Sequence, residues 1–327
     1  MRPTTVVDLA VANGVDLPTA DVESLFEYED LTGFLDVFWL VQSVLCTPDN
    51  WVGLAFESML DGAAHGLRYR EAFFTPARHL AAGQHLGDIV AALDSGLDMA
   101  QRVTGAACSL ILDFDRAFGP DAADAHMAEL VELRRTGRRG ADRVIGIGMD
   151  STELGVDPMS FLSAYAQAPE AGLRRTAHQG ENSGADAIRA AVDGLGCERI
   201  DHGISIFEDP ELVERFADEQ IPLTVCPNAN VRINPGVVAD LADHVFPAMR
   251  DADLLATLNA DDPSLAGLDL DQEYALCAST FGYDTGDMVS IALDAACASW
   301  LDDCESSVLM VEIKAAAAAR PRMPLSA

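Results

Sequence analysis

The sequence predicts a single α/β domain over residues 1–327, of the (β/α)8 TIM-type barrel class. Three observations support this prediction: the length of 327 residues, a hydrophobic content of 49%, and short apolar runs that alternate with helix-like segments. A barrel of this kind commonly occupies such a length as one domain. No run of about 18 uninterrupted apolar residues occurs, so a membrane-spanning helix is not predicted.

The chain opens with a helix and not with a strand. Residues 4–14 have helical periodicity and end at Gly14, a residue typical of helix ends. A closed barrel needs eight strands, and the first would lie just before this helix, where only Met1, Arg2 and Pro3 stand. We therefore expect that this chain lacks the opening strand of the barrel and that the reading frame upstream encodes it.

A helical insertion is predicted over about residues 18–62. Its most apolar part is 31–45, in which Phe34, Phe38 and Trp39 form an aromatic stripe. Such a stripe could line a substrate pocket, although packing in the core is its commoner fate.

Apolar runs of strand length define the sheet that follows. Between them lie segments such as 85–103 and 210–220, whose apolar residues recur every three or four positions. This alternation is typical of a parallel sheet covered by helices. The predicted strands are 67–74, 107–114, 143–150, 173–179, 198–203, 221–227 and 254–262.

The charge of the chain is strongly negative. Against 53 Asp and Glu there are 21 Lys and Arg, the only lysine is Lys314, and the net charge is −32. Phosphate polymers would be repelled, so nucleic acid is excluded as a partner. The acidic residues are spread along the chain, which favours a solvated acidic surface over an acidic tail that binds a partner. Because salt screens such repulsion, we hypothesise a halophilic host.

The cysteines and the N-terminal sequence indicate a cytoplasmic protein. Seven cysteines, an odd number with no C-x-x-C, argue against a disulfide framework and a structural zinc site. The first ten residues contain no apolar segment typical of a signal peptide.

Polar side chains suited to catalysis follow four successive predicted strands. In barrels the carboxyl ends of the strands meet at one mouth, where the active site lies. Imidazole and carboxylate are normal ligands of Zn²⁺, which lowers the pKa of a bound water to about 7. The sequence therefore favours hydrolysis by a metal-activated water. The residues at these strand ends are His178, Glu181, His202, Cys226, Asn228, Asp261 and Asp262, of which we assign Cys226 and Asn228 only a structural role.

Four motifs, TAHQGE, RIDHG, LTVCPNAN and LNADDP, occur in this order along the chain. Together they resemble the adenosine/adenine deaminase family of metal-dependent barrel hydrolases. The resemblance implies replacement of the 6-amino group of a purine by oxygen, with release of ammonia. It implies one divalent metal per chain, zinc or alternatively iron, held by His178 and Asp261. Glu181 matches the acid that protonates N1, His202 the residue that positions the water, and Asp262 the carboxylate that binds the N7 edge.

The sequence departs from the family pattern at two places. Gln179 stands where the family more often has alanine, and the His-x-His pair that completes the family's metal site occurs nowhere in the chain. An incomplete metal site leaves a second hypothesis open, namely a non-catalytic protein that binds purines or a partner.

The identity of the purine is also left open. Residues 148–153, GMDSTE, are closer to the adenine deaminase branch than to the LAGDE motif of adenosine-preferring members. Asp150 and Ser151 would then stand near the sugar side of the purine. This favours adenine over adenosine, with modified 6-aminopurines as a further alternative. The sequence makes no prediction about the oligomeric state.

Overall fold

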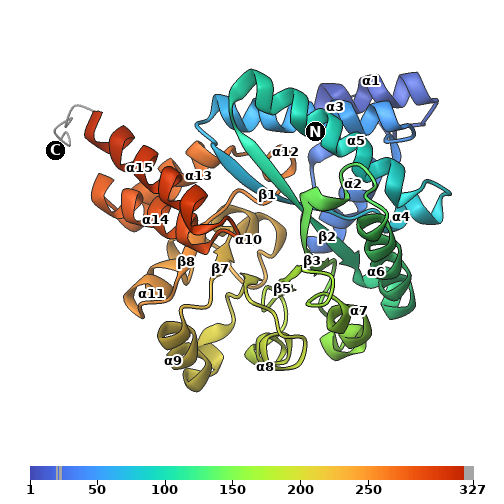
Figure 1. Ribbon diagram of the computed structural model, residues 1–327. Helices are drawn as coiled ribbons and strands as arrows, with labels where there is room; N and C mark the ends of the chain where they lie inside the picture. Colours follow the sequence, from blue (N-terminus) through green and yellow to red (C-terminus); the bar gives the residue numbers. More distant parts are fainter. Residues whose placement is uncertain (20, 22–23, 320–327) are drawn as a thin grey trace.

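The structure is a computed structural model that describes residues 1–19, 21 and 24–319 (Figure 1). Residues 20, 22–23 and 320–327 of the predicted domain, the first three of which belong to the predicted insertion, lie outside the described residues. The fold is the predicted TIM-type α/β barrel. None of the described helices is long and apolar enough to cross a membrane.

The sheet is parallel throughout, and each of the seven predicted strand runs contains observed strand. The order is β1-β2-β3-β4 in one four-stranded sheet and β5-β6-β7-β8 in a second. The strands are β1 (Tyr69–Phe74), β2 (Ala107–Asp115), β3 (Val144–Asp150), β4 (Arg174–Arg175), β5 (His178–Gln179), β6 (Ile200–His202), β7 (Leu223–Val225) and β8 (Ala256–Leu258).

The two sheets join within the predicted strand 173–179. β4 pairs with β3 and β5 pairs with β6, and only two residues separate them. At this interruption the carbonyl of Thr176 accepts a hydrogen bond from the Tyr165 hydroxyl at 2.7 Å. In the part of the chain that the structure describes, no strand pairs with the outer edge of β1 or of β8.

Helices surround the strands, with α1, α3 and α5 on one side and α7, α8 and α9 on the opposite side (Figure 1). The α-helices are α1 (Pro3–Asn13), α2 (Leu31–Ser43), α3 (Pro48–Ala64), α4 (Ala77–Ala81), α5 (Leu86–Thr104), α6 (Gly119–Arg135), α7 (Leu162–Gln167), α8 (Ala185–Arg189), α9 (Pro210–Glu219), α10 (Pro227–Ile233), α11 (Phe246–Asp251), α12 (Pro263–Ala266), α13 (Leu270–Phe281), α14 (Thr285–Ala298) and α15 (Asp303–Ala319).

α1 covers the predicted opening helix, and α2 and most of α3 lie within the range of the predicted insertion. α1 is followed by Gly14, whose φ of 66° is the left-handed conformation that glycine adopts without strain. In the insertion, Phe34 is buried and stacks on Phe38 at 6.0 Å between ring centroids. Trp39 lies under the guanidinium of Arg78. Of the two alternatives for the stripe, the contacts of Phe34 match core packing.

Close helix packing covers the β1 and β2 side of the barrel. α5 buries one apolar face, which includes Ile89, Leu93 and Leu97. At Gly96 a Cβ atom would stand 2.3 Å from the carbonyl oxygen of Val52 in α3, so only glycine permits this approach.

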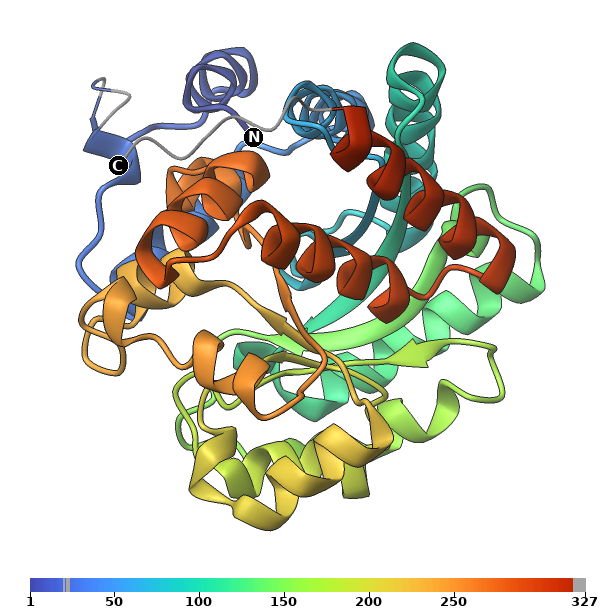
Figure 2. The same cartoon turned by 90° about the vertical axis from the view of Figure 1, so that its left-hand side faces the viewer.

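At the edge formed by β8, α14 packs on β8 and α15 packs on α14 (Figure 2).

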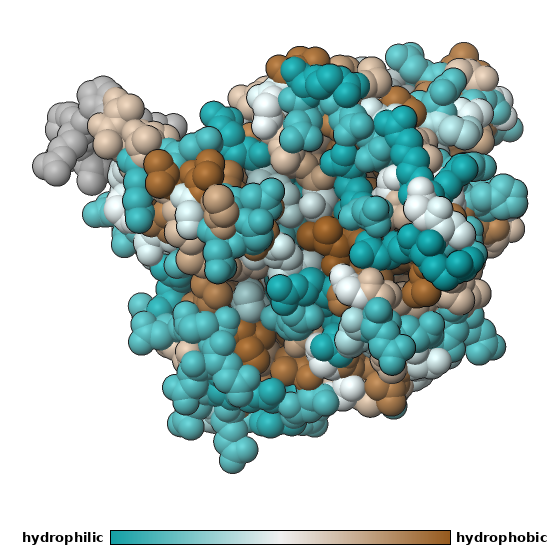
Figure 3. Space-filling model, in the orientation of Figure 1, coloured by the Kyte–Doolittle hydropathy of each residue, from teal (hydrophilic) through white to brown (hydrophobic). Residues whose placement is uncertain are grey.

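The molecular face seen in Figure 3 is mostly hydrophilic, with small scattered apolar patches, as expected for a solvated acidic surface.

The predicted strands near the site are longer than the observed ones. β6, β7 and β8 contain three residues each, and the residues after them form the loops of the barrel mouth. Asp261, placed at the end of the predicted strand 254–262, lies in such a loop with a φ of 55°.

Candidate active site

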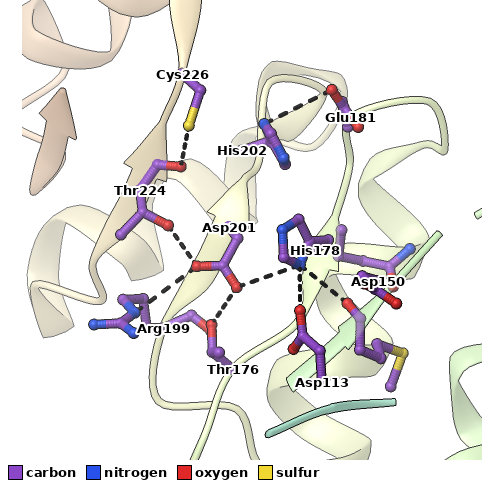
Figure 4. A network of polar contacts seen from close by, with 12 residues as sticks. Asp113, Asp150, Thr176, His178, Glu181, Arg199, Asp201, His202, Thr224 and Cys226 are labelled. Carbon is purple, nitrogen blue, oxygen red and sulfur yellow. Dashed lines mark hydrogen bonds and ion pairs between the residues drawn. The ribbon is translucent and has the colours of Figure 1, made fainter. Parts of the chain in front are cut away.

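His178, Glu181, His202 and Cys226, four of the side chains singled out by their positions at strand ends, lie around the ends of β5, β6 and β7 (Figure 4). His178 belongs to β5 and His202 to β6, and their ring centroids are 5.3 Å apart. One ligand atom each of His202, Cys226 and Asp261 lies within 4.8 Å of the others. The structure therefore brings together residues that are up to 59 positions apart in the sequence, from His202 to Asp261.

His178 is held in the form that can bind a metal. Its Nδ1 donates a hydrogen bond to the carbonyl of Met149 at 3.1 Å, which leaves the lone pair of Nε2 free. Carboxylate oxygens of Asp113 and Asp201 lie 3.7 and 4.0 Å from Nδ1, and the ring of Phe73 packs at 4.9 Å. Burial lowers the pKa of His178 to about 4, so the ring is neutral at neutral pH.

His202 and Glu181 form a buried pair. His202 is 2% exposed, and its Nδ1 lies 3.8 Å from Glu181 Oε1. Burial opposes the charged ring, but the carboxylates of Glu181 and Asp261 outweigh it and raise the pKa of His202. His202 also has a φ of 67°, a left-handed conformation that is unusual for a residue with a side chain.

Glu181 lies in a loop that a second glutamate organises. The carboxylate of Glu153, from the loop after β3, is 4% exposed. It accepts hydrogen bonds from three successive backbone N–H groups, those of Gly180 at 2.7 Å, Glu181 at 2.9 Å and Asn182 at 3.1 Å. The side chains of Gln179 and Ser183 donate to it as well. Glu153 therefore fixes the backbone from which Glu181 projects.

Asp261 and Asp262 follow β8 at the same mouth. Loss of solvation, with the negative charges of Glu181 and Asp201, raises the pKa of Asp261 to about 6. Loss of solvation and the neighbouring Asp261 raise the pKa of Asp262 to about 7. Repulsion between crowded carboxylates of this kind is relieved when a cation binds.

The residues present supply donor atoms of the kinds that a divalent metal binds. His178 offers a neutral imidazole nitrogen, and Asp261 offers a carboxylate in the cluster with His202 and Cys226. The cluster found among the described residues does not include His178, so the ligand pair His178 and Asp261 stays a prediction. The Sγ of Cys226 belongs to the same cluster of possible ligand atoms as His202 and Asp261. Burial raises the pKa of its thiol well above the ordinary value, whereas a bound metal would deprotonate a coordinating thiol. The structural role predicted for Cys226 therefore stays a prediction.

Asn228 and Asp150 also lie in the surroundings of the site. The backbone N–H of Asn228 donates to Glu273 at 3.0 Å and its side chain donates to the Ala266 carbonyl at 3.2 Å, contacts of a structural kind. Asp150, at the end of β3, accepts a hydrogen bond from the Thr75 hydroxyl, and burial raises its pKa to about 7.

Sequence reasoning missed Glu153 and Asn230, which contact the loop of Glu181 and the candidate catalytic pair, and His244, which contacts Asn230. Glu153 stands in GMDSTE and Asn230 in LTVCPNAN, so both lie in motifs that were examined for other residues. A buried polar residue next to a strand end is the signal that could have drawn attention to them. His244 lies in no such motif.

Comparison with known proteins agrees with this geometry. The family model described as adenosine deaminase matches residues 1–316. The chain belongs to the adenosine deaminase family. Within this family it is 37% identical to an adenine deaminase of Streptomyces coelicolor over 310 residues, which is 93% of this chain and 88% of that protein. It is 32% identical to an adenine deaminase of Cupriavidus necator, covering 99% and 91% of the two chains.

Solved structures of related proteins share the whole fold. The crystal structure of an adenine deaminase from Arthrobacter aurescens matches with a TM-score of 0.91 at 33% identity, covering 97% of this chain and 95% of that one. A zinc-bound amidohydrolase from Burkholderia ambifaria matches with a TM-score of 0.87 at 30% identity, covering 98% and 90%. The family is one of metal-dependent hydrolases, and the candidate donor set agrees with such chemistry.

Proposed function

We propose that this chain catalyses the hydrolytic deamination of a 6-aminopurine, with adenine as the substrate and hypoxanthine and ammonia as the products. The observation that carries the proposal is the buried pair of Glu181 and His202, 3.8 Å apart, beside the metal-ligand candidates His178 and Asp261. The relatives at 32–37% identity named adenine deaminase support the choice of reaction.

Each side chain has a role that its surroundings allow. Glu181 delivers a proton to N1 of the purine, because a carboxylic acid in a buried site is a competent general acid. His202 positions the attacking water, and Asp262 binds the N7 edge of the ring. His178 and Asp261 would hold the metal, zinc or alternatively iron, which when bound supplies a water of lowered pKa.

Adenine is preferred over adenosine because of the loop after β3. The carboxyl of Asp150 is buried and accepts a hydrogen bond from the Thr75 hydroxyl. In this proposal it lies on the side of the purine where a nucleoside carries its sugar. Adenosine and modified 6-aminopurines remain alternative substrates, and purine binding without catalysis is the alternative function. Ammonia release measured with adenine and with adenosine under matched conditions decides between these two substrates. A higher kcat/KM for adenosine contradicts the proposed preference for adenine. Purine binding without ammonia release by metal-loaded protein contradicts the reaction.

Replacement of Glu181 by glutamine tests its role as the acid. The amide keeps the shape of the side chain but has no carboxyl proton, so activity should fall by about 10²-fold or more while metal content stays unchanged. The exposed Glu214→Gln provides the control. Activity of Glu181→Gln within a few-fold of the parent would contradict the assignment.

The seven cysteines are all free, and three of them, Cys46, Cys297 and Cys304, are exposed. Free exposed thiols are typical of a reducing compartment, which supports the proposed cytoplasmic location.

A further inference from the structure

In the described part of the chain, Asn230 is the one side chain that forms hydrogen bonds with both members of the candidate catalytic pair. It lies on α10 and is fully buried. Its amide nitrogen is 3.0 Å from Glu181 Oε1 and 3.0 Å from His202 Nδ1. Its amide oxygen is 3.2 Å from Nε2 of His244, which is itself buried.

The orientation of this amide is determined from outside the site. The backbone N–H of Phe246 donates to Nδ1 of His244 at 3.0 Å. Because a backbone N–H is always a donor, Nδ1 of His244 must be the acceptor nitrogen, and the ring proton is on Nε2. Nε2–H then donates to Asn230 Oδ1, which places the NH₂ group of Asn230 toward Glu181 and His202.

Both hydrogens of that NH₂ group are used. An amide nitrogen has two donors, and Asn230 has two acceptors within reach, Glu181 Oε1 and His202 Nδ1. With the amide reversed, its oxygen would face the Glu181 oxygen, and His244 would point its N–H at the NH₂ group. Such mismatches between buried polar groups are costly, so the observed orientation is strongly favoured.

We propose that Asn230 and His244 are positioning residues that decide which atoms of the catalytic pair carry protons. Because Oε1 of Glu181 accepts a hydrogen bond from Asn230, the carboxyl proton of Glu181 can be carried only on Oε2. Because Nδ1 of His202 accepts the other hydrogen bond from Asn230, the neutral ring of His202 carries its proton on Nε2. His202 therefore offers an N–H to the attacking water, and Glu181 offers one oxygen to N1. This inference rests on the proposed function for the roles of the pair, but the hydrogen-bond assignment stands apart from it.

The assignment can be tested without activity. In the full-length chain labelled with ¹⁵N-histidine, the two ring nitrogens of a neutral imidazole have well-separated shifts, and only the protonated one shows a directly bonded hydrogen. At a pH where both rings are neutral, we expect Nε2–H for His244 and for His202. In Asn230→Ala the Nδ1 resonance of His202 should move, because it loses its donor. Protonated Nδ1 in neutral His244 or neutral His202 of the parent would overturn the proposal.

The kinetic consequence is tested with two matched pairs of variants. Asn230→Ala should lower kcat by roughly 10- to 100-fold, the range for residues that orient functional groups, with metal content and KM for the purine nearly unchanged. Asn234→Ala is its control, because Asn234 is a buried amide one turn further along the chain whose nitrogen has no partner among the described residues.

The second pair changes the outer residue. In His244→Gln an amide N–H replaces Nε2–H and should keep kcat close to that of the parent, whereas His244→Phe removes the donor and should lower kcat as Asn230→Ala does. A kcat of Asn230→Ala equal to that of Asn234→Ala, or equal loss in His244→Gln and His244→Phe, would overturn the proposal. If the metal-loaded parent releases no ammonia, the proposed function fails, and the ¹⁵N spectra still decide the hydrogen-bond assignment.

Discussion

Replacement of Glu153 by glutamine should destabilise the loop that carries Glu181. The glutamine amide can be placed two ways, and the less costly way turns its nitrogen toward Gly180, because the Ser183 hydroxyl can rotate to accept from it. The Gly180 N–H and the Gln179 side-chain N–H then lose the carboxylate oxygen and keep only the Ser183 hydroxyl, at 3.3 and 3.0 Å, as an acceptor, which costs about 1–3 kcal/mol. The N–H groups of Glu181 and Asn182 keep an oxygen, but a neutral one, at a loss of about 1 kcal/mol each.

These losses predict a destabilisation of about 3–5 kcal/mol. Unfolding entropy is about 2.1 cal/mol/K per residue, so for 327 residues it is about 0.7 kcal/mol/K. The melting temperature of Glu153→Gln should therefore fall by about 4–7 °C, measured by calorimetry at neutral pH. Activity should fall too, because the loop that places Glu181 loses its anchor.

Glu208→Gln is the matched control. Glu208 is exposed and accepts one backbone hydrogen bond, from Ala185 at 3.1 Å, which a glutamine oxygen can replace. Its melting temperature should change by less than about 1 °C. Equal shifts in the two variants would refute the reasoning, because they would show that the hydrogen bonds converging on Glu153 add nothing to stability.

Three other perturbations test the site and the surface. His178→Ala and Asp261→Ala should each lose bound metal, measured by elemental analysis, and retention of metal in either variant would remove that residue from the ligand set. The melting temperature of the parent should rise as KCl goes from dilute to molar, because salt screens the repulsion among −32 net charges; a flat curve would leave the halophile hypothesis without support. Burial raises the pKa of Glu273 to about 7, above its value of 4.5 in the unfolded chain. As pH rises from 4.5 to about 7 the unfolded chain loses this proton more readily than the folded protein, so the folded protein loses stability. Glu273→Gln should therefore gain melting temperature relative to the parent at about pH 8 but not at about pH 5, and an equal difference at both would contradict the raised pKa.

The sequence predicts the strands and their polar ends because both signals are local. An apolar run followed by His178, His202 or Asp261 can be recognised within about ten residues. Strand ends are less well predicted: the predicted strand 254–262 includes the mostly polar residues 259–262, whereas β8 ends at Leu258 and the positive φ of Asp261 takes the chain out of the sheet.

The supporting residues could not be predicted because their contacts are distant in sequence. Asn230 is 49 positions from Glu181 and 28 from His202, and Glu153 is 28 positions from Glu181. A polar residue that satisfies a distant buried group has the same local pattern as one that faces water. Only the fold shows which of the two it is.

The left-handed backbone of His202 and Asp261 has a consequence for the evolution of this chain. A residue with a Cβ atom in this conformation costs about 1–2 kcal/mol relative to glycine. Glycine at either position would relieve that cost and also abolish a functional side chain. In a library selected only for thermal tolerance, glycine should therefore accumulate at these two positions. Under the proposed function, selection for activity on a purine substrate would retain histidine and aspartate there.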